Sequence, residues 1–174
     1  MASASAADER AKARQQQQVS TGAARTKIRA AAVYLLTRDC LLIAAPAGVD
    51  ARRAALADPA KQESIRAEAA DIWVPKQVAD RVSEVMATLQ QQVDAPDMPT
   101  FDDAKLVVDS WGEVASNANS ATVAFTGHFS DLIAGRGGWE DEPESVWAVL
   151  LATAPDGHWQ LVSCESRPAD PGQR

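Results

Sequence analysis

The fold is decided by Ser145-Val-Trp-Ala-Val-Leu-Leu-Ala-Thr153, followed by Ala154-Pro-Asp-Gly157 and His158-Trp-Gln-Leu-Val-Ser-Cys-Glu165. These segments predict two β-strands and a tight turn, because proline presets φ and Asp-Gly supplies the backbone conformations that a turn demands. Both faces of the ribbon are largely apolar, so we expect both strands to lie centrally in a sheet covered on more than one side. With Ala154–Gly157 as the loop, the facing pairs are Trp147 with Cys164, Val149 with Val162, Leu151 with Gln160, Ala148 with Ser163, Leu150 with Leu161 and Ala152 with Trp159.

Composition indicates one ordinary globular domain. The chain has 174 residues, of which 46% are hydrophobic and 24% are charged. The net charge of −7 argues against nucleic acid as a partner, because that function normally requires a basic face. No apolar run reaches about 18 residues, so the chain predicts no membrane-spanning helix. Residues 1–27 lack the apolar region of a signal peptide. The sequence leaves open whether a membrane anchor precedes them.

The first half of the chain predicts helices. Residues 1–23 are polar without an apolar stripe, which is typical of a solvated stalk or a disordered segment. Apolar residues at helical spacing predict a core helix from Thr26 to Ala45, and further helices are expected over 50–56, 58–72 and 76–93. The last of these has the clearest amphipathic pattern.

The second half predicts a second hairpin before the one quoted above. Its strands run from Lys105 to Ala115 and from Ala121 to Phe129, around the turn-forming Ser116-Asn-Ala-Asn-Ser120. A four-residue loop predicts that Val114 faces Val123, Gly112 faces Phe125, Val108 faces Phe129, Asp109 faces His128, Trp111 faces Thr126 and Glu113 faces Ala124. Residues 132–144 are expected to form a loop. The tail 168–174 is expected to be disordered, which leaves 24–167 as a single α+β domain with its helices before its strands.

Asp109 and His128 are the best candidates for catalysis. A carboxylate beside an imidazole orients the ring and can raise its pKa, as a general base requires. The alternative is an ion pair between half-exposed side chains, which we favour because no nucleophile or oxyanion donor accompanies the pair at readable spacing. The sequence therefore predicts no catalytic residue, or Asp109 and His128 if the protein is an enzyme.

No cofactor or metal ion is expected. The two histidines and two cysteines follow no metal-ligand spacing, and the acidic run Glu140–Glu144 lacks the alternation of a calcium loop. The sequence leaves open whether Cys40 and Cys164 form a disulfide or stay free, buried thiols.

The chain contains five tryptophans. Trp147 and Trp159 fall on strands expected to be buried. Trp111 falls on the more polar face of the first hairpin, and Trp139 in a glycine-rich loop. Exposed aromatic side chains are candidate contacts for a protein partner, so we single out Trp111 and Trp139 for that role. The alternative is that they pad the edge of the core.

The order of three or four helices and a curved four-stranded antiparallel sheet resembles the nuclear transport factor 2-like (cystatin-like) superfamily. The closing strand carries the clearest motif: Asp156-Gly157-x-Trp159-x-Leu161-Val162-Ser163 is similar to the "DGxW" strand at the end of such domains. The resemblance covers about residues 26–166 and rests on this motif and the order of elements.

Two branches of that superfamily imply different functions. Extracytoplasmic domains of type IV secretion and conjugation assembly factors, and Mce-associated membrane proteins, follow an anchor and a helical stalk and act as scaffolds without catalysis. The polar segment before residue 23 fits that branch. It implies an extracytoplasmic domain whose partners are proteins or its own copies, held at the membrane by an anchor absent from this chain.

The other branch contains isomerases, cyclases and small-molecule-binding proteins with polar residues inside the cone. This chain departs from that pattern, because its single tyrosine, Tyr34, lies on the first helix. A soluble, cytoplasmic binding protein or enzyme is therefore the alternative function.

Overall fold

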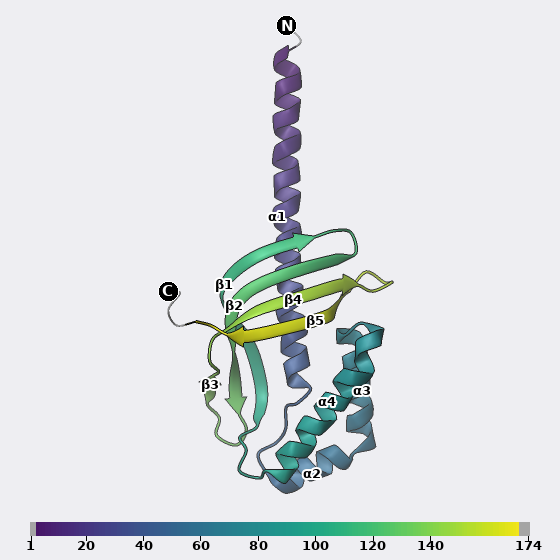
Figure 1. The fold of residues 1–174 in the computed structure, drawn as a ribbon, viewed down its shortest axis with the longest axis vertical. Coiled ribbons are helices and arrows are strands. Elements are labelled where there is room, and N and C mark those ends of the chain that lie inside the picture. Colours follow the sequence, from purple (N-terminus) through teal and green to yellow (C-terminus); the bar gives the residue numbers. More distant parts are fainter. Residues whose placement is uncertain (1–2, 171–174) are drawn as a thin grey trace.

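Four helices pack against one curved antiparallel sheet (Figure 1). The computed structural model describes the backbone of residues 3–170 and the side chains of residues 21–170. The helices are α1 (Ser3–Leu41), α2 (Val49–Ala57), α3 (Pro59–Ile72) and α4 (Pro75–Asp94); the strands are β1 (Phe101–Ser116), β2 (Ser120–Ile133), β3 (Trp139–Asp141), β4 (Ser145–Thr153) and β5 (Trp159–Pro168). The strand order is β1-β2-β4-β5, and the short β3 pairs with β2. The predicted α+β class, with the helices before the sheet, is confirmed.

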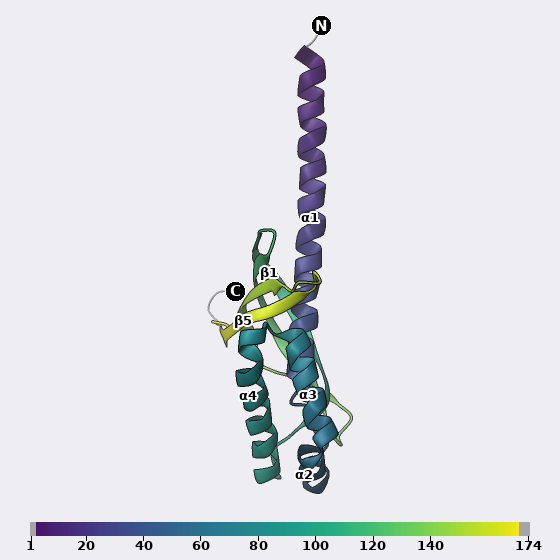
Figure 2. The same ribbon diagram turned by 90° about the vertical axis from the view of Figure 1, so that its right-hand side faces the viewer.

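Local signals placed α3 and α4 correctly. The Asp58 carboxylate accepts a hydrogen bond from Ala60 N–H at 2.9 Å, and Pro59 takes the first helical position, where its missing N–H costs nothing. Residue 73 ends α3 in an extended conformation, and Pro75 then begins α4. Figure 2 shows α3 and α4 side by side, with α2 at their base.

The first helix is longer at one end and shorter at the other than predicted. It runs without a break from Ser3 to Leu41, and its first half extends beyond the sheet (Figures 1 and 2). Its predicted end at Ala45 is wrong, because the chain tightens after Leu41 into turns in which each N–H bonds to the carbonyl three residues earlier. The division of the chain near residue 23 stays a prediction.

The core lies between the concave face of the sheet and the helices. One stripe of α1 supplies Ile28, Ala32, Leu35 and Leu36, which pack against alternate residues of the strands. The fully buried side chains of the sheet include Val123, Phe125, Leu151 and Leu161.

One carboxylate ties α1 to the other helices. Asp39 is 8% exposed, and its Oδ1 accepts hydrogen bonds from the Trp73 indole N–H at 2.7 Å and from Arg81 Nε at 2.8 Å. One residue earlier, on the more exposed side, Arg38 bonds to Glu68 and Asp71 of α3, each at 2.6 Å. In the sequence, Thr37-Arg38-Asp39 looks like a polar interruption of a core helix. In the structure it is the joint between α1, α3 and α4.

The register predicted for β4 and β5 is wrong, although the hairpin is correct. Thr153 pairs with Trp159, so five residues connect the strands instead of four, and the predicted pairs are displaced by one position. His158 leaves the strand because its ring bonds to the Asp156 carboxylate and approaches the Asp71 carbonyl at 3.3 Å. The positive φ of 91° falls on Gly157, as the turn requires.

A bulge then shifts the pairing by one further residue. It falls at Val162, between the pairs Leu151–Leu161 and Leu150–Ser163. The outer edge of β5 is occupied there, because Val74 N–H donates to the Leu161 carbonyl at 2.9 Å and Gln77 Nε2 to the Val162 carbonyl at 3.3 Å. The expectation that both strands lie centrally is therefore correct for β4 and wrong for β5, which is an edge strand.

Bulges also move the pairs of β1 with β2. Val114 faces Val123 as predicted, but the register shifts between Trp111 and Val114, and again between Val108 and Ser110. Trp111 consequently faces Phe125 instead of Thr126, and Gly112 has no facing partner. The remaining predicted pairs with Phe129 and His128 are displaced by two positions, onto Leu106 and Val107. The added residues bend the long strands, and Figure 1 shows the resulting curvature.

Two segments predicted to be irregular extend the sheet. Strand β2 continues to Ile133, and residues 139–141 form β3 against it, so the predicted loop 132–144 is wrong in part. At the C-terminal end, β5 includes Pro168, and Ala169 N–H donates to the Glu144 carbonyl at 3.0 Å. Residues 171–174 of the predicted disordered tail lie outside the described residues.

The Asp39 joint gives a stability prediction. Replacing Asp39 with Ala leaves Arg81 Nε and the Trp73 indole N–H without their acceptor in a half-buried site. We therefore expect the free energy of unfolding to fall by about 3 kcal/mol. Urea denaturation followed by circular dichroism measures this. The matched control is Glu63→Ala, whose pair with Arg66 is exposed on both sides and should contribute less than about 0.5 kcal/mol. Equal effects of the two substitutions would contradict the role assigned to Asp39.

Candidate interaction surfaces

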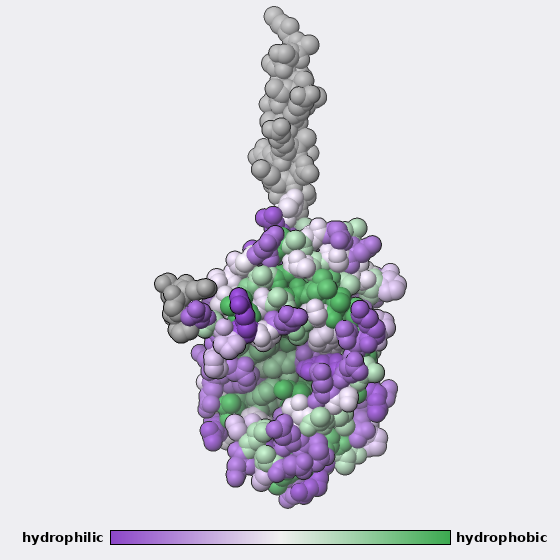
Figure 3. Space-filling view, in the orientation of Figure 1, coloured by the Kyte–Doolittle hydropathy of each residue, from purple (hydrophilic) through white to green (hydrophobic). Residues whose placement is uncertain are grey.

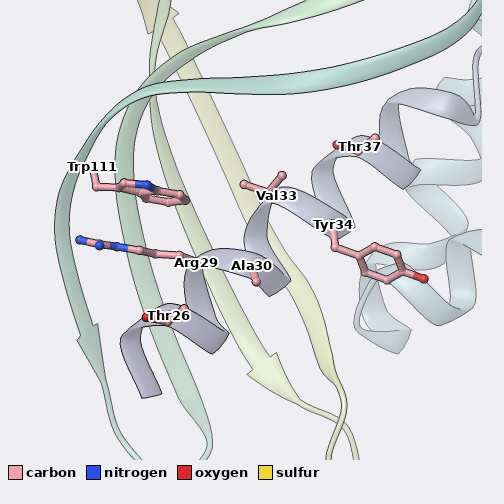
Figure 4. Close-up of a pocket in the computed structure, with 7 residues that line it drawn as sticks. All are labelled: Thr26, Arg29, Ala30, Val33, Tyr34, Thr37 and Trp111. Atoms are coloured by element: carbon pink, nitrogen blue, oxygen red, sulfur yellow. The ribbon is translucent and has the colours of Figure 1, made fainter. Parts of the chain in front are cut away.

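A groove of about 660 Å³ opens between α1 and β1. We call it the α1–Trp111 groove. Its α1 side follows one helical face at spacings of three and four residues, and its β1 side is a single indole (Figure 4). The lining residues are Thr26, Arg29, Ala30, Val33, Tyr34, Thr37 and Trp111. This face of α1 is the one that the sheet does not cover, because the buried stripe from Ile28 to Leu36 points the other way.

Trp111 forms one wall of this groove and stands on the helix-facing side of the sheet. Its ring packs on Phe125 with centroids 5.5 Å apart, and the Arg29 guanidinium lies 5.0 Å from its centroid on the groove side. Figure 4 shows the indole and the guanidinium in nearly parallel planes. Trp111 was predicted to lie on the polar face; the bulge beside it places the ring at the core edge, with its outer face in the groove. Its role as a partner contact stays a prediction.

Arg29 was not singled out from the sequence. Its Nε atom is buried, and no hydrogen-bond acceptor meets it among the described residues. A spacing argument would have placed Arg29 next to Val33 on one helical face, but only the position of Trp111 gives this arginine a planar partner. The sequence register put that ring on the opposite face of the sheet.

Trp139 is the second predicted partner contact, and it is exposed. Its side chain is 45% accessible on the short strand β3, next to Leu132 of β2. The Lys105 ammonium lies 4.3 Å from the centroid of its ring. A cation above an exposed indole favours this arrangement by about 0.5–1 kcal/mol. The rest of the ring presents an apolar surface to solvent.

The Asp109–His128 pair forms, though not by the predicted register. His128 faces Val107 in the ladder, yet its Nδ1 lies 3.1 Å from Asp109 Oδ2, because Asp109 sits in the bulge. Its Nε2 lies 3.8 Å from Asp141 Oδ1. Alternation along β2 puts His128 on the face opposite the buried Phe129, away from the space between sheet and helices. A catalytic role for the pair stays a prediction.

Asp131 is a buried carboxylate on the concave side of β2. It is 9% exposed, and its Oδ1 has no hydrogen-bond partner among the described residues. Burial, and secondarily the charge of Glu142, raises the pKa of Asp131 to about 6. Nothing in the sequence pattern set this aspartate apart from its neighbours, because its burial follows from the extension of β2 past Phe129.

The two cysteines are free thiols in the structure. Burial raises the pKa of Cys40 to about 12 and that of Cys164 to about 11. A thiol that stays protonated at neutral pH is a poor nucleophile and a poor metal ligand. Both side chains border the core as small apolar groups.

The described residues hold no group of three or more His, Cys, Asp or Glu side chains placed to bind a metal ion. Within the same part of the chain, no helix combines the length and the apolar character needed to cross a membrane. Figure 3 shows apolar side chains exposed over the strands, where a shallow groove of about 280 Å³ is lined in part by Ala124, Ala148 and Leu150.

Solved structures similar to this chain include nuclear transport factor 2-like proteins and a secretion-system protein. An NTF2-like protein with a cystatin-like fold from Novosphingobium aromaticivorans is 14% identical over 87% of this chain and 90% of that one, with a TM-score of 0.46. CagV, a VirB8 homolog of the type IV secretion system of Helicobacter pylori, is 8% identical over 81% of this chain and 99% of its own, with a TM-score of 0.45. These matches agree with the resemblance seen in the sequence.

A third match is an NTF2-like superfamily protein from Salmonella enterica, 20% identical over 49% of this chain, with a TM-score of 0.34. The aligned region spans 63% of that protein, less than two thirds of its length. No family model and no curated protein matches the chain. At these identities and TM-scores, the matches carry no inference about function.

The buried carboxylate gives a pH prediction. The pKa of Asp131 is higher in the folded chain than in the unfolded one, so its contribution favours the folded state below about pH 4 and is lost as the pH rises through about 6. We expect Asp131→Asn to stabilise the protein by about 1–3 kcal/mol at pH 7.5 and to have little effect at pH 4. Thermal unfolding at both pH values measures this, with the exposed Asp97→Asn as control. A gain of equal size at both pH values would contradict it.

Proposed function

We propose that this chain is a non-catalytic, extracytoplasmic interaction domain of a membrane-anchored protein that takes part in a secretion, conjugation or transport assembly. The observation that carries the proposal is that α1 continues well beyond the core as an uninterrupted helix. Residues 21–27 of this helix are exposed, and Ile28 is the first buried side chain described. The helical segment before it, roughly 25 residues at 1.5 Å per residue, extends about 37 Å from the core. A continuous helix of this kind holds a domain at a distance from the structure that carries it.

Two aromatic side chains supply the contacts that such a domain needs. Trp139 is exposed with Lys105 above its ring, and the half-buried Trp111 lines a groove beside the protruding helix. Aromatic residues with a fixed orientation contribute strongly to protein interfaces, because they bury a large area at a small entropic cost. Both lie on the part of the domain that includes β1 and β3.

A soluble small-molecule enzyme is the weaker alternative. The Asp109–His128 pair lies on the sheet face away from the helices, where a substrate would stay in contact with water. General acid–base chemistry gains most in a site that excludes solvent. The open setting of the pair supports an ion-pair role.

Cell fractionation tests where the domain resides. We expect the protein, in its native cells, to sediment with membranes and to be cleaved by protease added outside the cell membrane. Two controls accompany this test. Detergent should release the protein from the membrane fraction, and the protein should resist the protease until the outer layers of the cell are opened. A soluble, protease-protected product in the cytoplasm would overturn the extracytoplasmic part of the proposal and favour the small-molecule alternative.

The Trp139 contact is tested in the same cells. We expect Trp139→Ala to weaken crosslinking of this domain to its assembly several-fold, because truncating an exposed interface tryptophan removes contact area without opening the core. Trp139→Phe keeps a ring under Lys105 and should retain most of the crosslinking. Thermal unfolding of the purified variants shows whether the fold is unchanged. Undiminished crosslinking by the alanine variant would remove Trp139 from the interface.

A further inference from the structure

We infer that the α1–Trp111 groove binds an acidic segment of a partner protein, with a carboxylate on Arg29 and an apolar side chain against Trp111 and Val33. This inference rests on the proposed interaction function and names the chemistry of one of its partners. It places that partner at the base of the protruding part of α1, where the helix enters the domain.

The shape of the groove suits a side chain of another protein. Its volume of about 660 Å³ lies within the range of ligand and peptide sites, and its walls are one indole and one face of a helix. Ala30 between Thr26 and Val33 keeps the centre open, and Figure 4 shows the Tyr34 ring directed away from Trp111 along α1. Tyr34 is 60% exposed and marks the rim.

Arg29 is held as a receptor for a carboxylate. The stack on Trp111 at 5.0 Å fixes the plane of the guanidinium, and the packing of Trp111 on Phe125 fixes the indole in turn. The Arg29 Nε is buried and meets no acceptor among the described residues, so a partner carboxylate would reach the two terminal nitrogens. A planar, oriented guanidinium with unused donors binds a carboxylate through two parallel hydrogen bonds and loses little entropy in doing so.

The charges around the groove are complementary to an acidic partner. Arg25, Lys27 and Arg29 form no ion pair with any described residue, although the whole chain carries a net charge of −7. By contrast, Arg38, two turns further along α1, is neutralised by Glu68 and Asp71 of α3. The described side chains of α1 that carry positive charge are therefore paired inside the domain and unpaired where the helix emerges from it. Opposite charges steer association and exclude partners of the wrong sign.

A different protein is the occupant that we favour over a second copy. The groove and the acidic loop Glu140–Glu144 are different surfaces of the chain, so a contact between them would be head to tail. Such contacts either close into rings or form open filaments with a free groove at one end. The test below distinguishes them from a closed complex with another protein.

Selection from a random 12-residue peptide library displayed on phage tests the chemistry without assuming a sequence. The full 174-residue chain is the bait, and we expect the enriched peptides to combine Glu or Asp with large apolar residues. The comparison baits are Arg29→Glu, which reverses the charge in the groove, and Lys61→Glu, which makes the same change at an exposed site on α3. Circular dichroism establishes that both variants are folded.

The most enriched peptide is then titrated by fluorescence anisotropy. We expect the dissociation constant to rise at least about tenfold for Arg29→Glu, to stay within about twofold for Lys61→Glu, and to rise with salt concentration. A version of the peptide with Lys in place of its acidic residues should not bind. Selection without acidic enrichment, or equal affinity for the wild-type chain and Arg29→Glu, would overturn the inference.

Sedimentation of the wild-type chain tests whether a second copy of the chain occupies the groove. Concentration-dependent assembly that Arg29→Glu abolishes would assign the groove to a second copy and overturn the partner inference. The result is also separable from the proposed function. Failure of the peptide test with a membrane-bound, externally exposed protein removes only the groove, whereas peptide binding by a cytoplasmic protein keeps the groove and removes the localisation.

Discussion

The hydrogen bonds to the Asp39 carboxylate are the constraint on which the rest of the structure depends. Asp39 is the point where α1 meets both the start of α4, through Arg81, and the junction between α3 and α4, through Trp73. A buried carboxylate is tolerated only when donors surround it, so the position of one residue on α1 fixes the two others. The helices are therefore locked over the sheet by a polar contact inside an otherwise apolar interface.

The same junction also protects the sheet. Trp73 and Val74, which follow α3, lie along β5, where the Val74 N–H bonds to the Leu161 carbonyl. An edge strand with unpaired backbone groups invites pairing with another chain, and this contact with the bulge at Val162 breaks that edge. Asp39 thus holds Trp73, and Trp73 brings the following residue to β5. The termination of α3, the closure of the core and the protection of the edge follow from one short segment.

The helices and strands could be predicted from the sequence, but the pairing registers of the strands could not. Helix starts such as Asp58-Pro59 and hairpins such as Ala154–Gly157 are local signals, and the chain follows them closely. Bulges depend on contacts made after folding: the one at Val162 coincides with bonds from α4 and its preceding residue. For this reason Trp111 was assigned to the wrong face of the sheet, and the groove that it forms with Arg29 could not be predicted. The burial of polar groups such as Asp39 and Asp131 could not be predicted for a related reason, since it is decided by distant segments.

Helix α1 both supports the core and forms one side of the α1–Trp111 groove. Its buried stripe from Ile28 to Leu36 is packed on the sheet, and its opposite face lines the groove beside Trp111. Because Asp39 anchors this helix at its end, the groove face cannot turn without breaking the joint. A partner seated against Arg29 would therefore meet a surface that is already in place, and little of its binding energy would be lost to ordering the domain. In the proposed function, a helix that continues outward from such a surface would also transmit the orientation of the domain along its axis, as a scaffold requires.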